Sequence, residues 1–243
     1  LHQMRESDGL IVSTPYLKEV YSEYNQNIHV IPNSIDFKLW DRVKQKNKKG
    51  IRIGWAGGNA HGKDFEIIET VIKDVIEKHK DVTFVFVNGP AQNGLPQGLK
   101  GLPQVEHHAL WTPILKYPQM LGNMDFDIYI SPLVDSAFNR GKSNLKWLEA
   151  AALSIPCVAS DVGNFKETIH DGIDGFLAPN AFTFRSHLEL LIGDKKLRRA
   201  MGQNANTRIR QEVNTDITIK RYVDILEQQT MVSKDFLYKT ATA

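Results

Sequence analysis

The residues of this chain that could do chemistry gather in two loops. The first runs from Gly57 to Lys63 and contains three glycines and a lysine at an expected helix start. Bare backbone amides at a helix N-terminus, next to a lysine, can bind an anion such as a phosphate. The loop matches neither the dinucleotide fingerprint G-x-G-x-x-G nor the P-loop G-K-[ST]. An ordinary strand-to-helix turn therefore explains it equally well.

The second loop runs from Ser131 to Asn144 and leads into an apolar helix expected over residues 144–153. Ser143 or Asn144 suits the N-cap of that helix. Lys146 and Glu149 are three residues apart and therefore share one helix face. A carboxylate at this place could accept hydrogen bonds from a vicinal diol such as a ribose. The same pair could instead be a surface ion pair that contributes ~0.2–0.5 kcal/mol.

Alternating strands and helices position these loops. The predicted strands are 51–56, 82–87, a weak one near 105, 127–130, 157–160 and 175–178, and the predicted helices between them are 64–78, 114–121 and 144–153. This alternation indicates right-handed βαβ units and an α/β fold with a doubly wound parallel sheet. Ligands bind such sheets outside the carboxyl ends of the strands, which selects the loops at 57–63, 88–90 and 131–144.

The two ends of the chain have a different pattern. Residues 1–40 contain short strands at 9–14 and 28–31, too few for a core of their own, and we expect the end of a preceding N-terminal domain. The lysine-rich residues 41–50 are expected to be a linker, and residues 51–213 the ligand-binding domain. Residues 214–243 are expected to form a C-terminal helix and tail, frayed beyond Gln229.

Composition excludes several classes of protein. A net charge of +2 is too balanced to indicate nucleic-acid binding. The single cysteine, Cys157, excludes an internal disulfide and a cysteine-rich metal site, and its apolar strand favours burial. No apolar run approaches the ~20 residues of a membrane span and no signal peptide is visible, so we expect a cytoplasmic protein. The basic run from Lys195 to Arg199 is best explained as a solvated helix face, with peripheral contact to an anionic membrane as the alternative.

One block of the sequence resembles a known family. It reads Phe138-Asn139-x-x-Lys142-Ser143-x-x-Lys146-x-x-Glu149-Ala150-Ala151, followed by Ile155-Pro156-Cys157-Val158-Ala159-Ser160. It is similar to the donor-site helix of GT-B glycosyltransferases, most of all glycosyltransferase family 4 (group 1). Residues 161–167 and 171–177 continue in register, residues 31–36 resemble the passage between the two GT-B domains, and residues 54–63 stand where that family has its donor loop. The resemblance implies the C-terminal, Rossmann-like, donor-binding half of a GT-B fold.

The resemblance also implies which residues bind a nucleotide-diphosphate sugar. Lys63 matches the loop lysine that binds the pyrophosphate, and Glu149 matches the glutamate that holds the ribose hydroxyls. The amides of Ser143, Asn144 and Leu145 would approach the phosphates and the sugar. Gly57, Gly58 and Asn139 complete the expected donor-binding set. Trp111, just past a predicted strand, could stack on the base.

Two positions depart from the family pattern. The earlier glutamate of the family's Glu-x7-Glu motif, which contacts the donor sugar, is Gly141 here. The arginine that partners the loop lysine is also absent, and we expect Lys142 to supply the missing positive charge. No catalytic residue is assigned from the sequence.

The implied function is glycosyl transfer, with retention, from a nucleotide-diphosphate sugar to a glycan or glycoconjugate acceptor in polysaccharide biosynthesis. No cofactor and no metal are expected. The acceptor side of a GT-B enzyme lies on its N-terminal domain, so we expect this chain alone to be incomplete for catalysis. Two alternatives stay open: a GT-B nucleotide-sugar epimerase, and a non-catalytic nucleotide-sugar-binding or assembly module.

Overall fold

A single parallel sheet organises the larger part of the molecule. The computed structural model describes residues 1–45, 49–58, 62–88, 95–110 and 112–241. The sheet has six strands in the order β5-β4-β3-β6-β7-β8, and every neighbouring pair is parallel. Its strands are β3 (Ile51–Gly57), β4 (Val82–Asn88), β5 (Val105–Ala109), β6 (Ile128–Ser131), β7 (Cys157–Ser160) and β8 (Phe176–Ala178). The predicted doubly wound α/β fold is therefore confirmed.

The strand order creates a switch point in the middle of the sheet. The chain proceeds from β3 outward to β4 and β5, then returns to β6 on the other side of β3 and continues outward to β7 and β8. Connections leaving β3 and β6 therefore diverge to opposite sides and leave a crevice at the carboxyl ends of these strands. The two loops singled out by the sequence follow β3 and β6.

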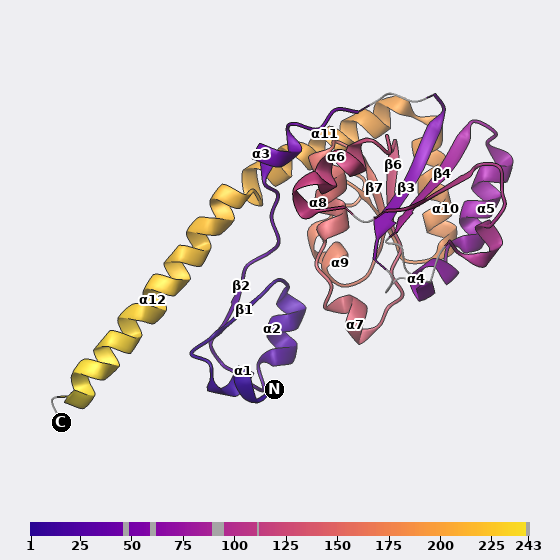
Figure 1. The fold of residues 1–243 in the computed structure, drawn as a ribbon. Helices are drawn as coiled ribbons and strands as arrows, with labels where there is room; N and C mark the ends of the chain where they lie inside the picture. The colour runs from indigo at the N-terminus through magenta and orange to yellow at the C-terminus, as the bar shows by residue number, and fades with distance from the viewer. Residues whose placement is uncertain (46–48, 59–61, 89–94, 111, 242–243) are drawn as a thin grey trace.

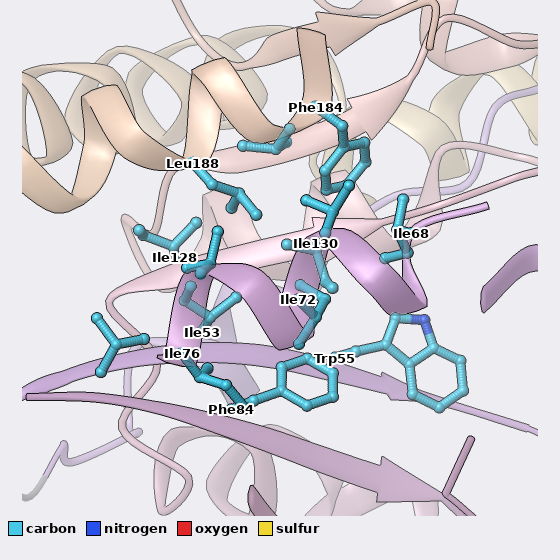
Figure 2. Packing of buried hydrophobic residues seen from close by; sticks show 14 of the residues in the cluster. Ile53, Trp55, Ile68, Ile72, Ile76, Phe84, Ile128, Ile130, Phe184 and Leu188 are labelled. Atoms are coloured by element: carbon cyan, nitrogen blue, oxygen red, sulfur yellow. The ribbon is translucent and has the colours of Figure 1, made fainter. Parts of the chain in front are cut away.

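Helices cover both faces of the sheet (Figure 1). On one face α5 (Glu69–Lys78) and α10 (Ala181–Gly193) enclose an apolar cluster with the alternate side chains of the strands (Figure 2). Its labelled members are Ile53, Trp55, Ile68, Ile72, Ile76, Phe84, Ile128, Ile130, Phe184 and Leu188. The other face packs against α6 (Tyr117–Gly122), α8 (Leu145–Ala152), α9 (Asn164–Thr168) and α11 (Lys195–Glu212). Burial on both faces explains the nearly continuous apolar runs of the strands.

Several helix predictions need correction. The helix expected over 64–78 is two helices, α4 (Gly62–Glu66) and α5, because Ile68 leaves the helical region with φ −126° and ψ −2°. The helix expected over 114–121 is a 3₁₀ turn, η3 (Ile114–Lys116), followed by α6. The expected polar loop before Gly141 contains the short helix α7 (Ala137–Arg140), and the 3₁₀ turn η2 (Gln97–Leu99), α9 and α10 were not predicted.

The N-terminal residues form a separate small unit. Strands β1 (Leu10–Val12) and β2 (Ile28–Val30) make a two-stranded parallel sheet, flanked by α1 (His2–Glu6) and α2 (Pro15–Tyr21). Thr14 caps α2 through its side chain, and a proline stands in the first turn. After this unit Ile35 and Trp40, the latter in α3 (Phe37–Trp40), are buried in the core of the larger domain. The proposed limits at residues 40, 50 and 213 stay predictions.

The C-terminal helix α12 (Thr215–Ala241) extends away from the sheet domain (Figure 1). It remains helical beyond Gln229, where a frayed end was expected. Asn27 of the N-terminal unit donates a hydrogen bond to Gln229 at 3.1 Å. None of the described helices is both long and apolar enough to cross a membrane.

Candidate functional site

A cleft of about 510 Å³ lies at the carboxyl ends of the central strands. One wall is the end of β3 and the following glycines, and the opposite wall is the start of α8. The lining residues are Ala56, Gly57, Gly58, Val87, Leu110, Thr112, Tyr117, Met120, Leu133, Lys142, Ser143, Leu145, Lys146, Glu149 and Phe165. The cleft therefore occupies the switch point at which the topology predicts a ligand.

The start of α8 faces this cleft. Asn144 is at the N-cap position, but its side chain makes no capping hydrogen bond. The side-chain amide of Asn144 instead donates a hydrogen bond to the hydroxyl of Thr168 at 3.3 Å. Ser143 accepts a hydrogen bond at 2.7 Å from Asn33 of the segment that precedes α3. The first amides of α8 carry the partial positive charge of the helix toward the cleft.

Glu149 lies one turn further into α8, at the floor of the cleft. Its side chain is buried, with 7% of the residue exposed. Tyr117 donates a hydrogen bond to its Oε2 at 3.1 Å. The single hydroxyl hydrogen of Tyr129 is shared between that oxygen, at 3.4 Å, and the Ala56 carbonyl, at 3.2 Å. Burial raises the pKa of Glu149, and the nearby Lys146 ammonium and the two hydroxyls lower it. The burial of Glu149 shows that a surface ion pair with Lys146 is the wrong interpretation.

Lys146 reaches back across the end of β3. Its ammonium donates to the backbone carbonyl of Ala56 and lies 4.9 Å from the centre of the Trp55 ring. Burial lowers the pKa of Lys146, and Glu149 opposes this effect. A Cβ at Gly57 would lie 2.6 Å from the Lys146 Nζ and 2.6 Å from a carbon of the buried Trp55 ring. The end of the lysine could move aside, but the packed ring could not, so the ring favours glycine at this position.

Asp64 was not among the predicted site residues, and its carboxylate connects the two functional loops. It is in α4 and only 2% exposed. Its Oδ1 accepts hydrogen bonds from the Val134 backbone amide at 2.9 Å and from Asn139 at 2.7 Å. Its Oδ2 lies 3.4 Å from the Lys142 ammonium. The only sign of Asp64 in the sequence was an acidic residue in the first helical turn after a glycine-rich loop. Such a residue by itself indicates only a favourable interaction with the helix dipole.

The structure brings together most of the predicted site residues. Gly57, Gly58, Lys142, Ser143, Leu145 and Glu149 line the cleft. Asn139 and Asn144 are buried and do not line it. The side-chain amide of Asn139 donates one hydrogen bond to Asp64 and one to the Val134 carbonyl. Asn139 therefore connects the two loops and has no amide hydrogen left for a ligand. Lys63 is exposed in α4 and is not part of the lining, and Trp111 lies outside the described residues.

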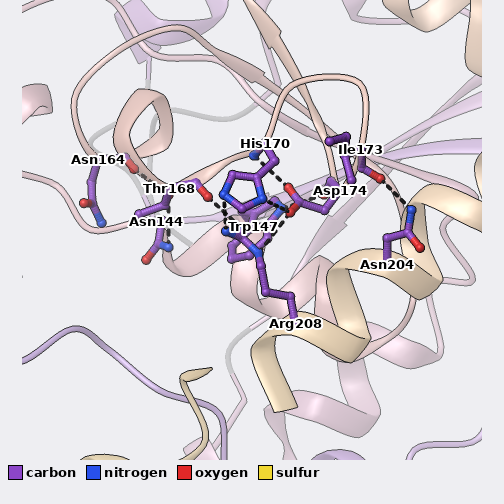
Figure 3. A network of polar contacts seen from close by, with 9 residues as sticks. All are labelled: Asn144, Trp147, Asn164, Thr168, His170, Ile173, Asp174, Asn204 and Arg208. Atoms are coloured by element: carbon purple, nitrogen blue, oxygen red, sulfur yellow. Dashed lines mark hydrogen bonds and ion pairs between the residues drawn. The ribbon is translucent and has the colours of Figure 1, made fainter. Parts of the chain in front are cut away.

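A polar network fixes the other side of α8 (Figure 3). Trp147 is buried, and its ring N–H donates to the backbone carbonyl of Asp174 at 2.9 Å. The Arg208 guanidinium of α11 lies over that ring at 4.6 Å and forms an ion pair with the buried Asp174 carboxylate at 2.9 Å. This network sets the orientation of the helix that carries Lys146 and Glu149.

The chemical capacity of the cleft follows from these contacts. A lysine and helix amides at one end can stabilise negative charge, and a carboxylate on the floor can accept hydrogen bonds from hydroxyl groups. One wall of the cleft is apolar and could pack against a flat ring; it is formed by Val87, Leu110 and Met120. Within the described part of the chain, no three histidine, cysteine or acidic residues are grouped as metal ligands.

Comparisons with known proteins agree with this arrangement. The family model described as "Glycosyl transferases group 1" matches residues 50–194. No curated protein sequence matches the chain.

Solved structures resemble the fold. Sucrose-phosphate synthase from Thermosynechococcus elongatus superposes with a TM-score of 0.74 at 15% identity, over 94% of this chain and 60% of its own. Anabaena HepE, solved with UDP and glucose, has a TM-score of 0.70 at 15% identity, over 89% of this chain and 62% of its own. The C-terminal domain of a Francisella tularensis group 1 glycosyltransferase, LpcC, has a TM-score of 0.52 at 21% identity, over 76% of this chain and 95% of that domain.

These likenesses show the fold, the Rossmann-like half of a GT-B glycosyltransferase, as predicted. The chain spans about three fifths of the length of the first two of these proteins.

Proposed function

Because the chain belongs to the glycosyl transferases group 1 family, we propose that it supplies the donor-binding half of an enzyme that transfers a sugar from a nucleotide diphosphate. The family supports sugar transfer in general. The donor, the acceptor, retention at the anomeric carbon and a role in polysaccharide biosynthesis belong to the proposal. So does a separate acceptor-binding N-terminal domain, without which the chain would not complete the reaction.

The observation that carries the proposal is the placement of Lys142, the start of α8 and Glu149 around one cleft. In the bound state the diphosphate would lie against the amides of Ser143 to Leu145 and the Lys142 ammonium. These groups would stabilise the negative charge that grows on the leaving diphosphate during transfer. Glu149 would accept hydrogen bonds from the ribose hydroxyls.

Tyr117 and Tyr129 keep the Glu149 carboxylate in position for this role. Burial raises the pKa of both hydroxyls, so each remains protonated. Tyr117 donates to the carboxylate, and Tyr129 shares its hydrogen between the carboxylate and the Ala56 carbonyl. Only part of the hydrogen-bonding capacity of a carboxylate is used by two donors, which leaves acceptor sites for a diol. Asp64 and Asn139 would act indirectly, by holding Lys142 and its loop.

Lys63 keeps a proposed role at the pyrophosphate because it lies in the first turn of α4, next to the glycine loop. UDP sugars are the first donors to test, since HepE was solved with UDP and glucose.

A non-catalytic binding module is a second candidate, favoured by one observation. Position 141, where the family has a sugar-contacting glutamate, is glycine, and a Cβ there would lie 3.1 Å from the Leu17 side chain of α2. A glutamate could enter only if Leu17 moved. Nucleotide-sugar binding without transfer or hydrolysis by the longer protein would favour this module.

The test is a calorimetric titration of the chain with UDP, GDP, ADP and TDP and their sugars. We expect one base to be preferred, and Glu149→Gln to weaken its binding by about 1–3 kcal/mol, or roughly 5- to 150-fold. Glutamine still accepts from the tyrosines, so this variant should remain folded. The matched control is Glu77→Gln on the exposed face of α5, which should bind as wild type. Absence of binding to every nucleotide, or wild-type affinity in Glu149→Gln, would overturn the proposal.

A further inference from the structure

One side chain from the N-terminal part of the chain reaches the start of α8. Asn33 lies in the segment that runs from β2 to α3, between the N-terminal unit and the sheet domain (Figure 1). Its side-chain amide donates a hydrogen bond to the Oγ of Ser143 at 2.7 Å. Ser143 lines the cleft and immediately precedes Asn144, the N-cap residue of α8. Two segments that are 110 residues apart in the sequence therefore meet at the edge of the cleft.

The backbone around Asn33 is held on both sides. Two residues before it, the Ile31 amide donates to the Val12 carbonyl of the N-terminal unit at 2.9 Å. Two residues after it, the Ile35 amide donates to the Val213 carbonyl at 3.1 Å. Both isoleucines are buried. The Asn33 amide is therefore already in place when a ligand arrives, and its contact with Ser143 costs little further backbone entropy on binding.

The direction of this hydrogen bond determines what the Ser143 hydroxyl can do. A serine hydroxyl has one hydrogen to donate and two lone pairs that accept. Because Asn33 is the donor, it uses a lone pair and leaves the Ser143 hydrogen for another acceptor. A hydroxyl that accepts from one side turns its hydrogen away from that donor. Since Ser143 lines the cleft, a ligand oxygen bound there can accept this hydrogen.

The surroundings of Ser143 favour a negatively charged acceptor. Lys142 precedes it in the lining of the cleft, and the first amides of α8 follow it, so positive charge lies on both sides. Glu149, the acidic residue of α8, lies one turn further along and already accepts a hydrogen bond from Tyr117 at 3.1 Å. A negatively charged ligand oxygen therefore fits the Ser143 hydrogen best.

We propose that Asn33 is a positioning residue for the diphosphate of the donor. By donating to Ser143, it directs the Ser143 hydrogen toward a diphosphate oxygen. This role rests on the proposed function, which places the diphosphate at the start of α8. It adds a charge-assisted hydrogen bond from a side chain to the contacts from the backbone amides and Lys142. Affinity for the diphosphate then depends on the segment that leaves the N-terminal unit.

Calorimetric titration of variants tests this role, with whichever of UDP, GDP, ADP and TDP the wild type binds most tightly. We expect Asn33→Ala to weaken binding of this nucleoside diphosphate about fivefold, because the Ser143 hydroxyl is no longer oriented. Binding of the matching nucleoside, measured by ligand-observed NMR, should not change, because the nucleoside has no phosphate. An equal loss for the nucleoside would show that Asn33 only supports the fold, and would overturn the role.

Two further variants test whether Asn33 acts through the hydroxyl. Ser143→Ala should weaken the diphosphate about tenfold, and Asn33→Ala should cause no further loss in that background. Asn33→Asp keeps the size of the side chain but cannot donate to the hydroxyl. The aspartate would accept the Ser143 hydrogen and turn it away from the ligand, so Asn33→Asp should weaken binding at least as much as Asn33→Ala.

A matched control lies in the N-terminal unit. Asn25 donates to two carbonyls of that unit at 3.0 and 2.8 Å, so Asn25→Ala loosens the unit without touching Ser143 and should bind as wild type. Wild-type affinity in Asn33→Ala or Asn33→Asp would overturn the role of Asn33, and so would a further loss in the Ser143→Ala background or an equal loss in Asn25→Ala. If Glu149→Gln still weakens binding in these cases, the proposed function stands. Absence of binding to every nucleotide would overturn both.

Discussion

Asp64→Ala should destabilise the protein strongly, although the side chain is small and lies in a short helix. The Asp64 carboxylate accepts from the buried side-chain amide of Asn139 and from the partly buried backbone amide of Val134. Alanine would leave both without this acceptor. It would also leave the Lys142 ammonium without the carboxylate that lies 3.4 Å away.

The size of the effect follows from these contacts. A buried donor that loses its acceptor costs about 1–3 kcal/mol, which applies to Asn139. The partly buried Val134 amide can be hydrated in part, so its loss costs about 1 kcal/mol. Lys142 adds little, because its side chain is 21% exposed and water can replace the lost contact. We therefore expect the free energy of unfolding to fall by about 2–4 kcal/mol.

Urea unfolding followed by circular dichroism measures this loss. Asp64→Asn should fall between wild type and Asp64→Ala, because asparagine keeps one oxygen as acceptor but loses the charge. The matched control is Asp135→Ala, which removes an exposed aspartate paired with Arg140 on the same loop and should change the unfolding midpoint much less. A loss below about 1 kcal/mol for Asp64→Ala would refute the view that this carboxylate ties the two loops together.

Three further predictions concern other parts of the domain. Gly57→Ala should weaken nucleotide binding about tenfold in a calorimetric titration, because its Cβ would lie 2.6 Å from the buried Trp55 ring as well as from the Lys146 Nζ. Gly58→Ala, whose Cβ meets nothing within 4 Å, should bind normally. Burial lowers the pKa of His187 from 6.5, so below pH 6.5 the unfolded chain binds the proton more readily than the folded chain, and stability decreases as the pH is lowered. His187→Gln should reduce this pH dependence of the urea unfolding midpoint. An unchanged pH dependence in the variant would contradict the assignment to His187. Burial raises the pKa of Cys157 to about 12, so iodoacetamide should modify this thiol at neutral pH only after the protein unfolds. Fast labelling of the folded protein would show instead that the thiol is accessible.

Hydrophobic patterning was sufficient to predict the sheet. Residues 82–87 carry one polar side chain among apolar ones, which is typical of a strand buried on both faces, and β4 is such a strand. The break between α4 and α5 could not be predicted in the same way. Phe65 and Ile68 keep helical spacing in the sequence, and only packing against the sheet makes the chain turn at Ile68.

The cleft was predictable where it depends on helix starts and strand ends. Sequence position placed Gly57, Ser143 and Glu149 near the carboxyl edge of the sheet, and the family resemblance assigned them to the donor; all three line the cleft. The role of Asp64 depends on a contact across about seventy residues of chain, and a single sequence carries no record of that contact. Asn139 was assigned to the ligand because the sequence does not show that its side-chain amide is bound by the buried Asp64.

The donor site itself is tested most directly by a crystal structure of the chain with a bound nucleotide diphosphate. We expect the diphosphate within hydrogen-bond distance of the amides of Ser143 to Leu145 and of the Lys142 ammonium, with the pentose hydroxyls bound to Glu149. A nucleotide bound away from the start of α8, or in the cleft with its pentose out of reach of Glu149, would contradict it.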